Sequence, residues 1–458
     1  MAIADTPLPL RCAAEFIGAF LPFFSVGFNV LSGAAVFGGL SLATCLTVLT
    51  YSLAGLSGAN FSPAVTLALF TSKKLGGPGV DGRLAGTYIA VQMLAGLFSG
   101  ICMVNMFADP FRLGPGAGFS WLGACVCEFL YSMFFCFVVL NTTAARTYKS
   151  EGNDFYGLAI GAMAMAAAYA AGPISGGLIN PAITIGADLA GAGTGFGKSL
   201  IYAFFQLLGA AVAAILFKLV RPLDFDEHET PRTRLISEMI GTFALVLTVG
   251  LAVLAKTPMA GLAIAGCLTS MVYSLGDVSG AHFNPAVTAA VLVSGHDPEM
   301  APRRAGYYVG SQLLSALLAG WCFCLLHGGS FAVAPGQGFS LAAAVVSESF
   351  FTGLLAFVVL GVAVAPKTKS AQLFGLAIGL CVLVGGFSVG NVSGAFMNPA
   401  VAVGVAASHA SWSSVANALR YCFFQLIGGS VAGFLAHCLH SEIAVVQSET
   451  TKLTFANA

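Results

Sequence analysis

The sequence predicts an all-α membrane protein of twelve transmembrane spans, arranged as two parallel domains that each contain six transmembrane helices plus two re-entrant half-helices. Three observations support this fold class. Hydrophobic residues make up 57% of the chain and charged residues only 8%, where a soluble domain carries roughly 25% charged residues. One unit of sequence recurs four times, and each unit contains a motif that starts a helix inside apolar surroundings.

Composition also excludes several classes of function. The formal net charge is zero and no basic cluster occurs, which argues against a nucleic-acid partner. The 12 cysteines fall almost entirely in apolar segments, where reduced, buried thiols are expected. We therefore expect no metal site and no cofactor. No histidine, cysteine or serine group is spaced for catalysis, so an enzyme is the least favoured class.

A glutamate that opens an apolar segment marks each of the four units. These glutamates are separated by 113, 110 and 110 residues, and they are Glu15, Glu128, Glu238 and Glu348. A glutamine in a later apolar run keeps the same register, at Gln92, Gln206, Gln312 and Gln425. Regular spacing of this kind is the signature of an internal repeat.

Each unit also carries a Ser-Gly turn followed by a helix-capping residue and Pro-Ala. A capping residue directly before proline predicts an abrupt helix start. The capping residues follow their glutamates after 47, 52, 46 and 50 residues. The four motifs are Ser62, Pro63, Ala64; Asn180, Pro181, Ala182; Asn284, Pro285, Ala286; and Asn398, Pro399, Ala400.

The helix that follows each motif is too short to cross a membrane. Two full apolar runs precede the motif in each unit and a third follows it. Only about ten apolar residues follow each motif before polar residues interrupt the run. The motif helix is therefore about 15 Å long, half of a hydrocarbon core of about 30 Å. Three crossings per unit place consecutive units in opposite orientations, and six crossings per pair of units place the two halves of the chain parallel.

Charge placement and one polar interruption predict the topology and the domains. Fifteen of the 19 Lys and Arg residues fall on the side that carries both termini, which predicts cytoplasmic termini. The first apolar run is expected to be a retained span rather than a secretory signal. We predict an N-terminal tail (1–10), a first domain (11–220), a cytoplasmic linker (221–232), a second domain (233–440) and a C-terminal tail (441–458).

These motifs resemble those of the aquaporins, the major intrinsic protein family. The resemblance covers nearly all of residues 11 to 440, and it implies two parallel aquaporin-like domains fused in tandem. In each domain two half-helices would point their N-termini at each other, where their positive dipole ends disfavour cations and hydrated protons. The implied function is a passive channel for water and small uncharged solutes, with one pore per domain.

The motif residues and the glutamates have more than one possible role. The capping side chains, Ser62 with Asn180 and Asn284 with Asn398, can offer hydrogen-bond donors to a solute, hold the re-entrant loops, or do both. The glutamates are interpreted as braces that accept N–H bonds from irregular backbone, in preference to a proton relay. His282 is expected to brace a loop as well. The sequence does not identify the hydrogen-bond or ion-pair partners of Asp188 and Asp277.

Departures from the family's usual residues concern selectivity. The family usually places an arginine after the second Asn-Pro-Ala, in a four-residue constriction, and this chain has Ile183 and Val401 there. Spacing from the motifs places the remaining constriction residues at Leu42, Ala168 and Gly177 in the first domain and at Ile264, Gly386 and Ala395 in the second. A wider constriction without a fixed charge favours ammonia, urea or hydrogen peroxide beside water.

Ser62 is a further departure, because a hydroxyl offers one donor where an asparagine amide offers two. The first pore is therefore expected to differ from the second in rate or selectivity. Two other classes of function remain: a poorly conducting protein that organises the membrane, and a secondary transporter. The expected partners are water, small neutral solutes and the lipid bilayer, and the resemblance implies a homodimer that forms a pseudo-tetramer.

Overall fold

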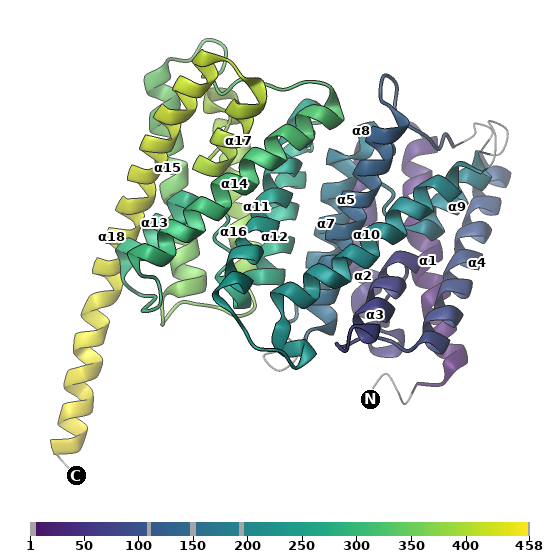
Figure 1. Ribbon diagram of the computed structural model, residues 1–458, viewed down its shortest axis with the longest axis horizontal. Helices are drawn as coiled ribbons and strands as arrows, with labels where there is room; N and C mark the ends of the chain where they lie inside the picture. The colour runs from purple at the N-terminus through teal and green to yellow at the C-terminus, as the bar shows by residue number, and fades with distance from the viewer. Residues whose placement is uncertain (1–5, 108–110, 147–152, 192–196, 457–458) are drawn as a thin grey trace. The chain divides into compact units, whose positions relative to one another are not determined.

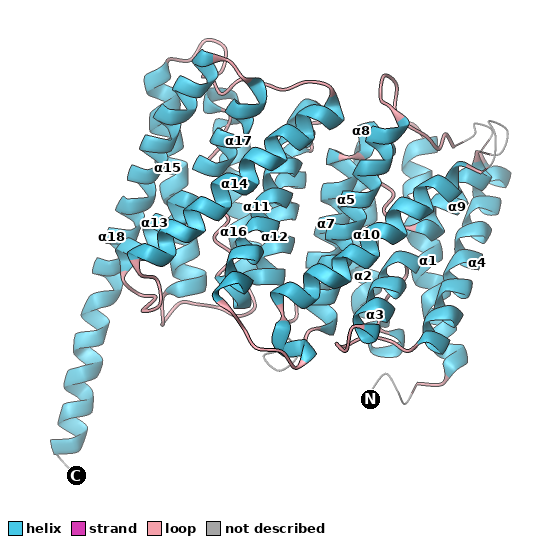
Figure 2. Ribbon diagram, in the orientation of Figure 1, coloured by secondary structure: helices cyan, strands magenta, loops and turns pink. Residues whose placement is uncertain are grey.

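The computed structural model describes residues 6–107, 111–146, 153–191 and 197–456, and their side chains as far as residue 439. The first five residues of the predicted N-terminal tail and the last two of the predicted C-terminal tail lie outside these ranges. Helices are the only regular secondary structure in the described ranges (Figure 2).

The first two repeats form helices that end where the motifs predict (Figure 1). Two short 3-10 turns, η2 and η5, and a π turn, η3, accompany them. In chain order the elements are α1 (Leu8–Leu31), η2 (Ala35–Phe37), α2 (Gly38–Ser57), α3 (Pro63–Lys74), α4 (Gly82–Met106), α5 (Trp121–Val139), η3 (Leu140–Ala144), α7 (Tyr156–Ala170), α8 (Gly172–Ser175), α9 (Pro181–Ala190), α10 (Lys198–Val220) and η5 (Pro222–Phe225).

In the described ranges, the last two repeats follow the same order of long helices and motif helices, without counterparts of η2, α8 and η5. A π turn, η6, extends α15 as η3 extends α5. The elements are α11 (Pro231–Leu254), α12 (Ala260–Ser279), α13 (Pro285–Ser294), α14 (Pro302–His327), α15 (Leu341–Val359), η6 (Leu360–Val364), α16 (Phe374–Ser393), α17 (Pro399–His409) and α18 (Trp412–Ala456).

Eleven of these helices, within the described ranges, are long and apolar enough to cross a membrane. The expected twelfth span is α7, which has 15 residues and is followed after Ala171 by the short helix α8. Pro173 explains the break, because it lacks the N–H that would bond the carbonyl four residues earlier. Together α7 and α8 reach Ser175, as α2 reaches Ser57.

The four motif helices have the short length that the sequence predicts. They contain 12, 10, 10 and 11 residues and are α3, α9, α13 and α17. Glycines let the long helices approach them closely: a methyl group at Gly96 of α4 would lie 2.0 Å from the Ala182 carbonyl oxygen, and one at Gly429 of α18 would lie 2.5 Å from that of Ala286. Small residues at helix contacts are typical of membrane proteins, where close backbone packing replaces the hydrophobic effect.

The helices group into two compact units. One contains residues up to Ser237 together with Leu247–Ala281 and Cys322–Ser330. The other contains Glu238–Val246, His282–Trp321 and the chain from Phe331 onward. The helices α11 and α14 thus contribute residues to both units, and the domain boundaries drawn from the sequence remain a prediction.

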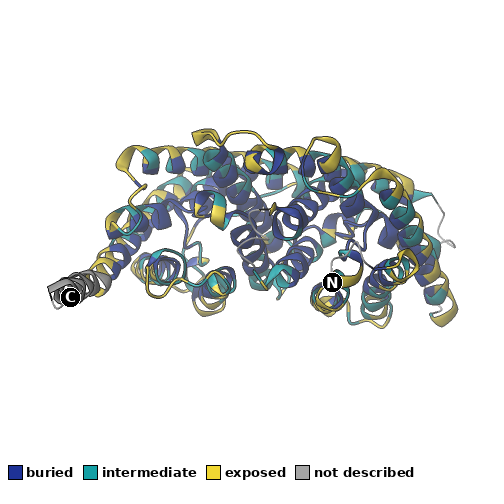
Figure 3. Ribbon diagram, turned by 90° about the horizontal axis from the view of Figure 1, so that it is seen from below, coloured by how far each residue is buried: buried dark blue, intermediate teal, exposed yellow. Residues whose placement is uncertain are grey.

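Within the first of these units, α12 packs against α7. The Ser270 hydroxyl donates to the Ala159 carbonyl oxygen at 2.7 Å, and the Tyr131 and Thr248 hydroxyls lie 3.1 Å apart. The most apolar 18 residues of Trp121–Ala144 are 83% buried, whereas those of Leu8–Leu31 are 39% buried. Figure 3 shows that many helices carry buried residues on one side and exposed residues on the other. A helix of the third repeat is therefore part of the packing of the second repeat.

Candidate functional site

Each half-helix begins with a side chain that caps its first turn. The Ser62 hydroxyl oxygen accepts a hydrogen bond from the backbone N–H of Ala64 at 3.2 Å. The three asparagine caps each accept the equivalent bond at 2.9 Å, and they are Asn180, Asn284 and Asn398. All four caps have extended backbone, and proline follows directly. Capping satisfies one of the free N–H groups at a helix start.

The loop before each cap repeats an unusual backbone conformation. The residue that precedes the cap has a positive φ in all four loops, with values of 55°, 46°, 49° and 53° at Phe61, Ile179, Phe283 and Met397. The residue two positions earlier also has a positive φ, at Ala59, Gly177, Ala281 and Ala395. A left-handed conformation costs a non-glycine residue about 1–2 kcal/mol. The loops therefore need bonds that hold them in place.

A buried glutamate supplies these bonds in the first repeat. The Glu15 carboxylate accepts from the backbone N–H groups of Asn60 at 3.0 Å and Phe61 at 2.7 Å. It also accepts from the Ser57 hydroxyl at 2.6 Å and the Gln92 amide at 2.7 Å. Glu15 has no exposed surface, so a carboxylate with four donors satisfies a charge that burial would otherwise make costly.

The other three repeats place a glutamate in the same way. Each accepts from the two backbone N–H groups before the cap and from the glutamine of its repeat, at distances of 2.7 to 3.1 Å. The glutamates are Glu128, Glu238 and Glu348, and none has exposed surface.

A threonine in the half-helix completes the network in three repeats. The glutamine amide donates to this hydroxyl at 2.9, 2.9 and 3.0 Å, at Thr66, Thr184 and Thr288. The fourth repeat has Ala402 in its place, and the Gln425 carbonyl oxygen is buried without a hydrogen-bond partner. His282 lies beside this network: its Nδ1 is 3.1 Å from the Thr288 hydroxyl, and Asn60 donates to Thr66 at 3.3 Å in the first repeat.

Amide groups connect the two loops of each pair. The Asn180 amide donates to the Phe61 carbonyl oxygen at 3.1 Å. The Asn284 amide donates to the Met397 carbonyl oxygen, and the Asn398 amide to the Phe283 carbonyl oxygen, both at 2.9 Å. The pairs that the sequence predicts, Ser62 with Asn180 and Asn284 with Asn398, are thus brought together.

A narrow cavity lies between the first two loops. Its lining includes Ser62, Asn60 and Asn180, and apolar side chains supply the remainder. The cavity has room for about one water molecule. Two of the predicted constriction residues, Leu42 and Ile183, belong to this lining.

The other predicted constriction residues have different surroundings. Gly177 is buried against α7, where a methyl group would lie 3.1 Å from the Cα of Ala168. Val401 is buried at the start of α17. Half-buried positions are found for Ala168, Ile264, Gly386 and Ala395.

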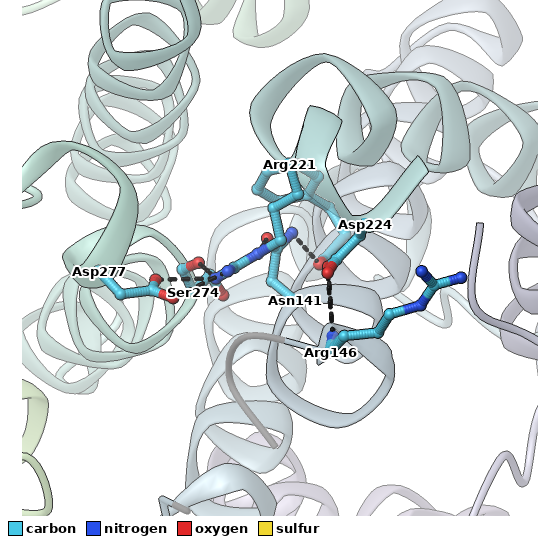
Figure 4. Close-up of polar contacts among 7 residues, drawn as sticks. Asn141, Arg146, Arg221, Asp224, Ser274 and Asp277 are labelled. Carbon is cyan, nitrogen blue, oxygen red and sulfur yellow. Dashed lines mark hydrogen bonds and ion pairs between the residues drawn. The ribbon is translucent and has the colours of Figure 1, made fainter. Parts of the chain in front are cut away.

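The two aspartates without expected partners bind different parts of the chain. Asp188 accepts from the N–H groups of Gly197 and Ser199 at 2.8 and 2.9 Å and so caps the start of α10. Asp277 receives two bonds of 2.8 Å from the Arg221 guanidinium (Figure 4). Arg221 is buried and also donates to the Asn141 side chain at 2.6 Å. This ion pair joins α12 to the end of α10.

The serines that end α2, α8 and α16 are part of the network and were not singled out from the sequence. The Ser-Gly turn of each motif was the available signal, since Ser57, Ser175 and Ser393 all donate to the glutamate of their repeat. The threonine after Pro-Ala was a second signal. Among the described residues, no group of three or more His, Cys, Asp and Glu is placed to hold a metal ion.

An all-helical chain with paired, carboxylate-braced half-helices defines a polytopic membrane protein with re-entrant loops. Comparison with known proteins gives the family. The model of the family "Major intrinsic protein" matches residues 8–161, 116–259 and 235–440. Aquaporin NIP1-1 of Zea mays is 35% identical over 219 residues, which are 45% of this chain and 74% of that protein. Aquaporin TIP4-2 of Zea mays is 32% identical over 253 residues, 50% of this chain and 94% of that protein.

A solved aquaglyceroporin from Plasmodium falciparum aligns with 48% of this chain and all of its own, at 20% identity and a TM-score of 0.37. The chain belongs to the major intrinsic protein family, as a tandem fusion of two aquaporin-like units. Membership supports a membrane channel for water or small solutes rather than an enzyme.

Proposed function

We propose that the protein is a passive channel for water and small uncharged solutes, with one pore in each pair of repeats. The observation that carries the proposal is the meeting of two half-helix starts in each pair, where Asn180 bonds the loop before Ser62, and Asn284 and Asn398 bond each other's loops. Two helix N-termini that face one point concentrate positive potential there, which disfavours cations.

The motif side chains have two roles in this proposal. Each asparagine amide carries two N–H groups, and one of them bonds the opposite loop. The second N–H is the donor for a passing solute. Glu15, Glu128, Glu238 and Glu348 act as braces for the loops and not as proton carriers, since each is fully engaged by backbone and side-chain donors. His282 supports the network through Thr288.

Solute selectivity follows from the constriction. Leu42, Ala168, Gly177 and Ile183 form it in the first pore, and Ile264, Gly386, Ala395 and Val401 in the second. None of these side chains is charged. An uncharged constriction passes less polar neutral solutes, so ammonia, urea and hydrogen peroxide are proposed beside water.

The assembly proposed for the chain is a homodimer that forms a pseudo-tetramer with four pores and both termini in the cytoplasm. Exposed apolar side chains support it: α15 and α16 carry Val346, Phe350, Leu380 and Phe387 at their surfaces, whereas the equivalent helices α5 and α7 are mostly buried. Mass measurement in detergent should give a two-chain complex. A stable four-chain complex or a monomer alone would contradict the assembly.

Stopped-flow measurement on proteoliposomes tests the channel with two single-pore backgrounds. Gly386→Trp is designed to block the second pore and Ala168→Trp the first, and the doubly blocked protein is the control. We expect each single variant to pass water, urea and ammonia above the double variant, with flux linear in the solute gradient. Flux that requires an ion gradient would favour a secondary transporter, and flux equal to that of empty liposomes would favour a membrane-organising protein.

A further inference from the structure

The two pairs of half-helices differ in one hydrogen bond at their centre. In the second pair the exchange is reciprocal: Asn284 donates to the Met397 carbonyl and Asn398 to the Phe283 carbonyl. In the first pair, Asn180 donates to the Phe61 carbonyl. Ser62 takes the place of Asn284, and Ile179 takes the place of Met397. In the described part of the chain, Ser62 donates no hydrogen bond to the Ile179 carbonyl oxygen.

Side-chain length explains the missing bond. The hydroxyl of a serine ends one bond closer to the backbone than the amide nitrogen of an asparagine, a difference of roughly 1.5 Å. The Ser62 oxygen instead accepts from the Ala64 N–H at 3.2 Å. Its O–H remains a donor, and the carbonyl oxygen of Ile179 remains an acceptor.

Both groups border the same narrow cavity. Ser62 and Ile179 line the cavity of the first pore together with Asn60 and Asn180, and Ser62 is 1% exposed. The cavity has room for about one water molecule. A buried acceptor and a buried donor that border a space of this size are the conditions under which proteins hold an internal water.

We propose that a water molecule is bound at the centre of the first pore, donating to the Ile179 carbonyl and hydrogen-bonded to the Ser62 hydroxyl, where it replaces the missing amide. In the second pore the Asn284 amide takes the place of this water, because it bonds the Met397 carbonyl directly. Both loop carbonyls of the second pore already accept an amide bond, whereas the Ile179 carbonyl of the first pore accepts none from the opposite cap. A water held by one more bond leaves more slowly.

The proposed water has a consequence for rate that rests on the proposed channel function. One hydrogen bond is worth about 0.5–1.5 kcal/mol, so we expect water flux through the first pore to be about two- to ten-fold lower than through the second. Ser62→Asn, in the background in which Gly386→Trp blocks the second pore, should raise flux towards that of the second pore. The matched exchange Asn284→Ser, with the first pore blocked by Ala168→Trp, should lower it.

If the smaller serine side chain only widened the pore, the two exchanges would change the flux in the opposite directions. Ser62→Asn would then lower flux and Asn284→Ser would raise it, and either result, or no change in both, overturns the kinetic part of the inference. Expression level and the size-exclusion elution profile in detergent identify a variant that has not folded. If one of the two variants does not fold, the flux of the other still tests the inference.

A density map of the full chain at high resolution tests the site independently of flux. We expect an ordered water within hydrogen-bond distance of the Ile179 carbonyl and the Ser62 hydroxyl, and its loss in Ser62→Asn. An empty position in the parent protein would overturn the inference. A water in the map together with no flux through either pore would instead refute the channel and leave the site standing.

Discussion

The loops of the first and third repeats hold their half-helices by the same bonds but carry different side chains beside the cap. Glu15 and Glu238 accept from the same two backbone positions, yet the side chains there are Asn60 in one loop and His282 in the other. The bonds that hold the loop use backbone N–H groups, so they do not depend on the side chain. The comparison teaches that the glutamate preserves the position of the loop while the side chains of the loop are free to change.

The largest expected effect comes from removing this glutamate in one repeat. Glu15→Leu leaves four buried donors without their acceptor, including the N–H groups of Asn60 and Phe61. The loss should be at least about 3 kcal/mol of stability, since each unsatisfied buried group costs about 1–3 kcal/mol. We expect Glu15→Leu to abolish flux through the first pore and Glu238→Leu through the second, measured in the two single-pore backgrounds.

The control for this prediction is Glu15→Gln, which keeps the shape and one acceptor oxygen and should retain part of the flux. Flux through the first pore that survives Glu15→Leu unchanged would show that the loop does not need its brace.

The next effect concerns the end of the last helix in each domain. Arg221 directly follows the last residue of α10, and the equivalent position in α18, by spacing from Gln206 and Gln425, is His440. Arg221→Ala leaves the Asp277 carboxylate without its partner at a largely buried site, which should cost roughly 3 kcal/mol and lower the melting temperature in detergent.

The double variant Arg221→Met with Asp277→Leu removes both charges and should recover most of the stability lost in Arg221→Ala. An unchanged melting temperature for Arg221→Ala would mean that solvent already screens the ion pair.

A smaller effect is expected on selectivity. Val401→Arg places a charged donor group at the constriction of the second pore and should lower urea and ammonia permeation more than water permeation. Ile183→Arg is the matched variant in the first pore. Solute flux that is unaffected by Val401→Arg would mean that Val401 does not line the constriction.

The smallest effect compares the fourth repeat with the first two. Ala402→Thr would supply the hydroxyl that Thr66 and Thr184 donate to the glutamine carbonyl at 3.2 Å, and Gln425 has a buried carbonyl oxygen without a partner. We expect a gain of about 1 kcal/mol in a thermal melt. A loss of stability would show that Ala402, which has no exposed surface, leaves no room for the larger side chain.

Much of the fold could be predicted because it is repeated. The spacing of the glutamates and the Pro-Ala motifs locates α3, α9, α13 and α17, and the structure starts each helix at the expected proline. The shortness of α7 was not predicted, although Pro173 is visible in the sequence, because a proline near a helix end can either stop the helix or begin a new turn.

The site was predictable in its residues and less so in its bonds. Glutamate and asparagine positions follow from the repeat, but which backbone groups Glu15 bonds depends on the left-handed conformation of Ala59 and Phe61, and sequence patterns do not encode such non-glycine conformations. The pairing of Arg221 with Asp277 joins residues 56 positions apart on different helices. A contact of that kind depends on how the helices pack, and no local sequence pattern predicts it.

The predicted linker is partly folded: Arg221, Asp224 and Phe225 are buried, so only residues 226–230 form an exposed connection before α11. Five residues span at most about 17 Å. A tether this short gives α12 a high effective concentration beside α7. The contact between the two helices is therefore intramolecular, and it does not weaken when the protein is diluted in a large membrane. Substitutions that would separate two independent chains can therefore accumulate between α7 and α12 without separating these helices.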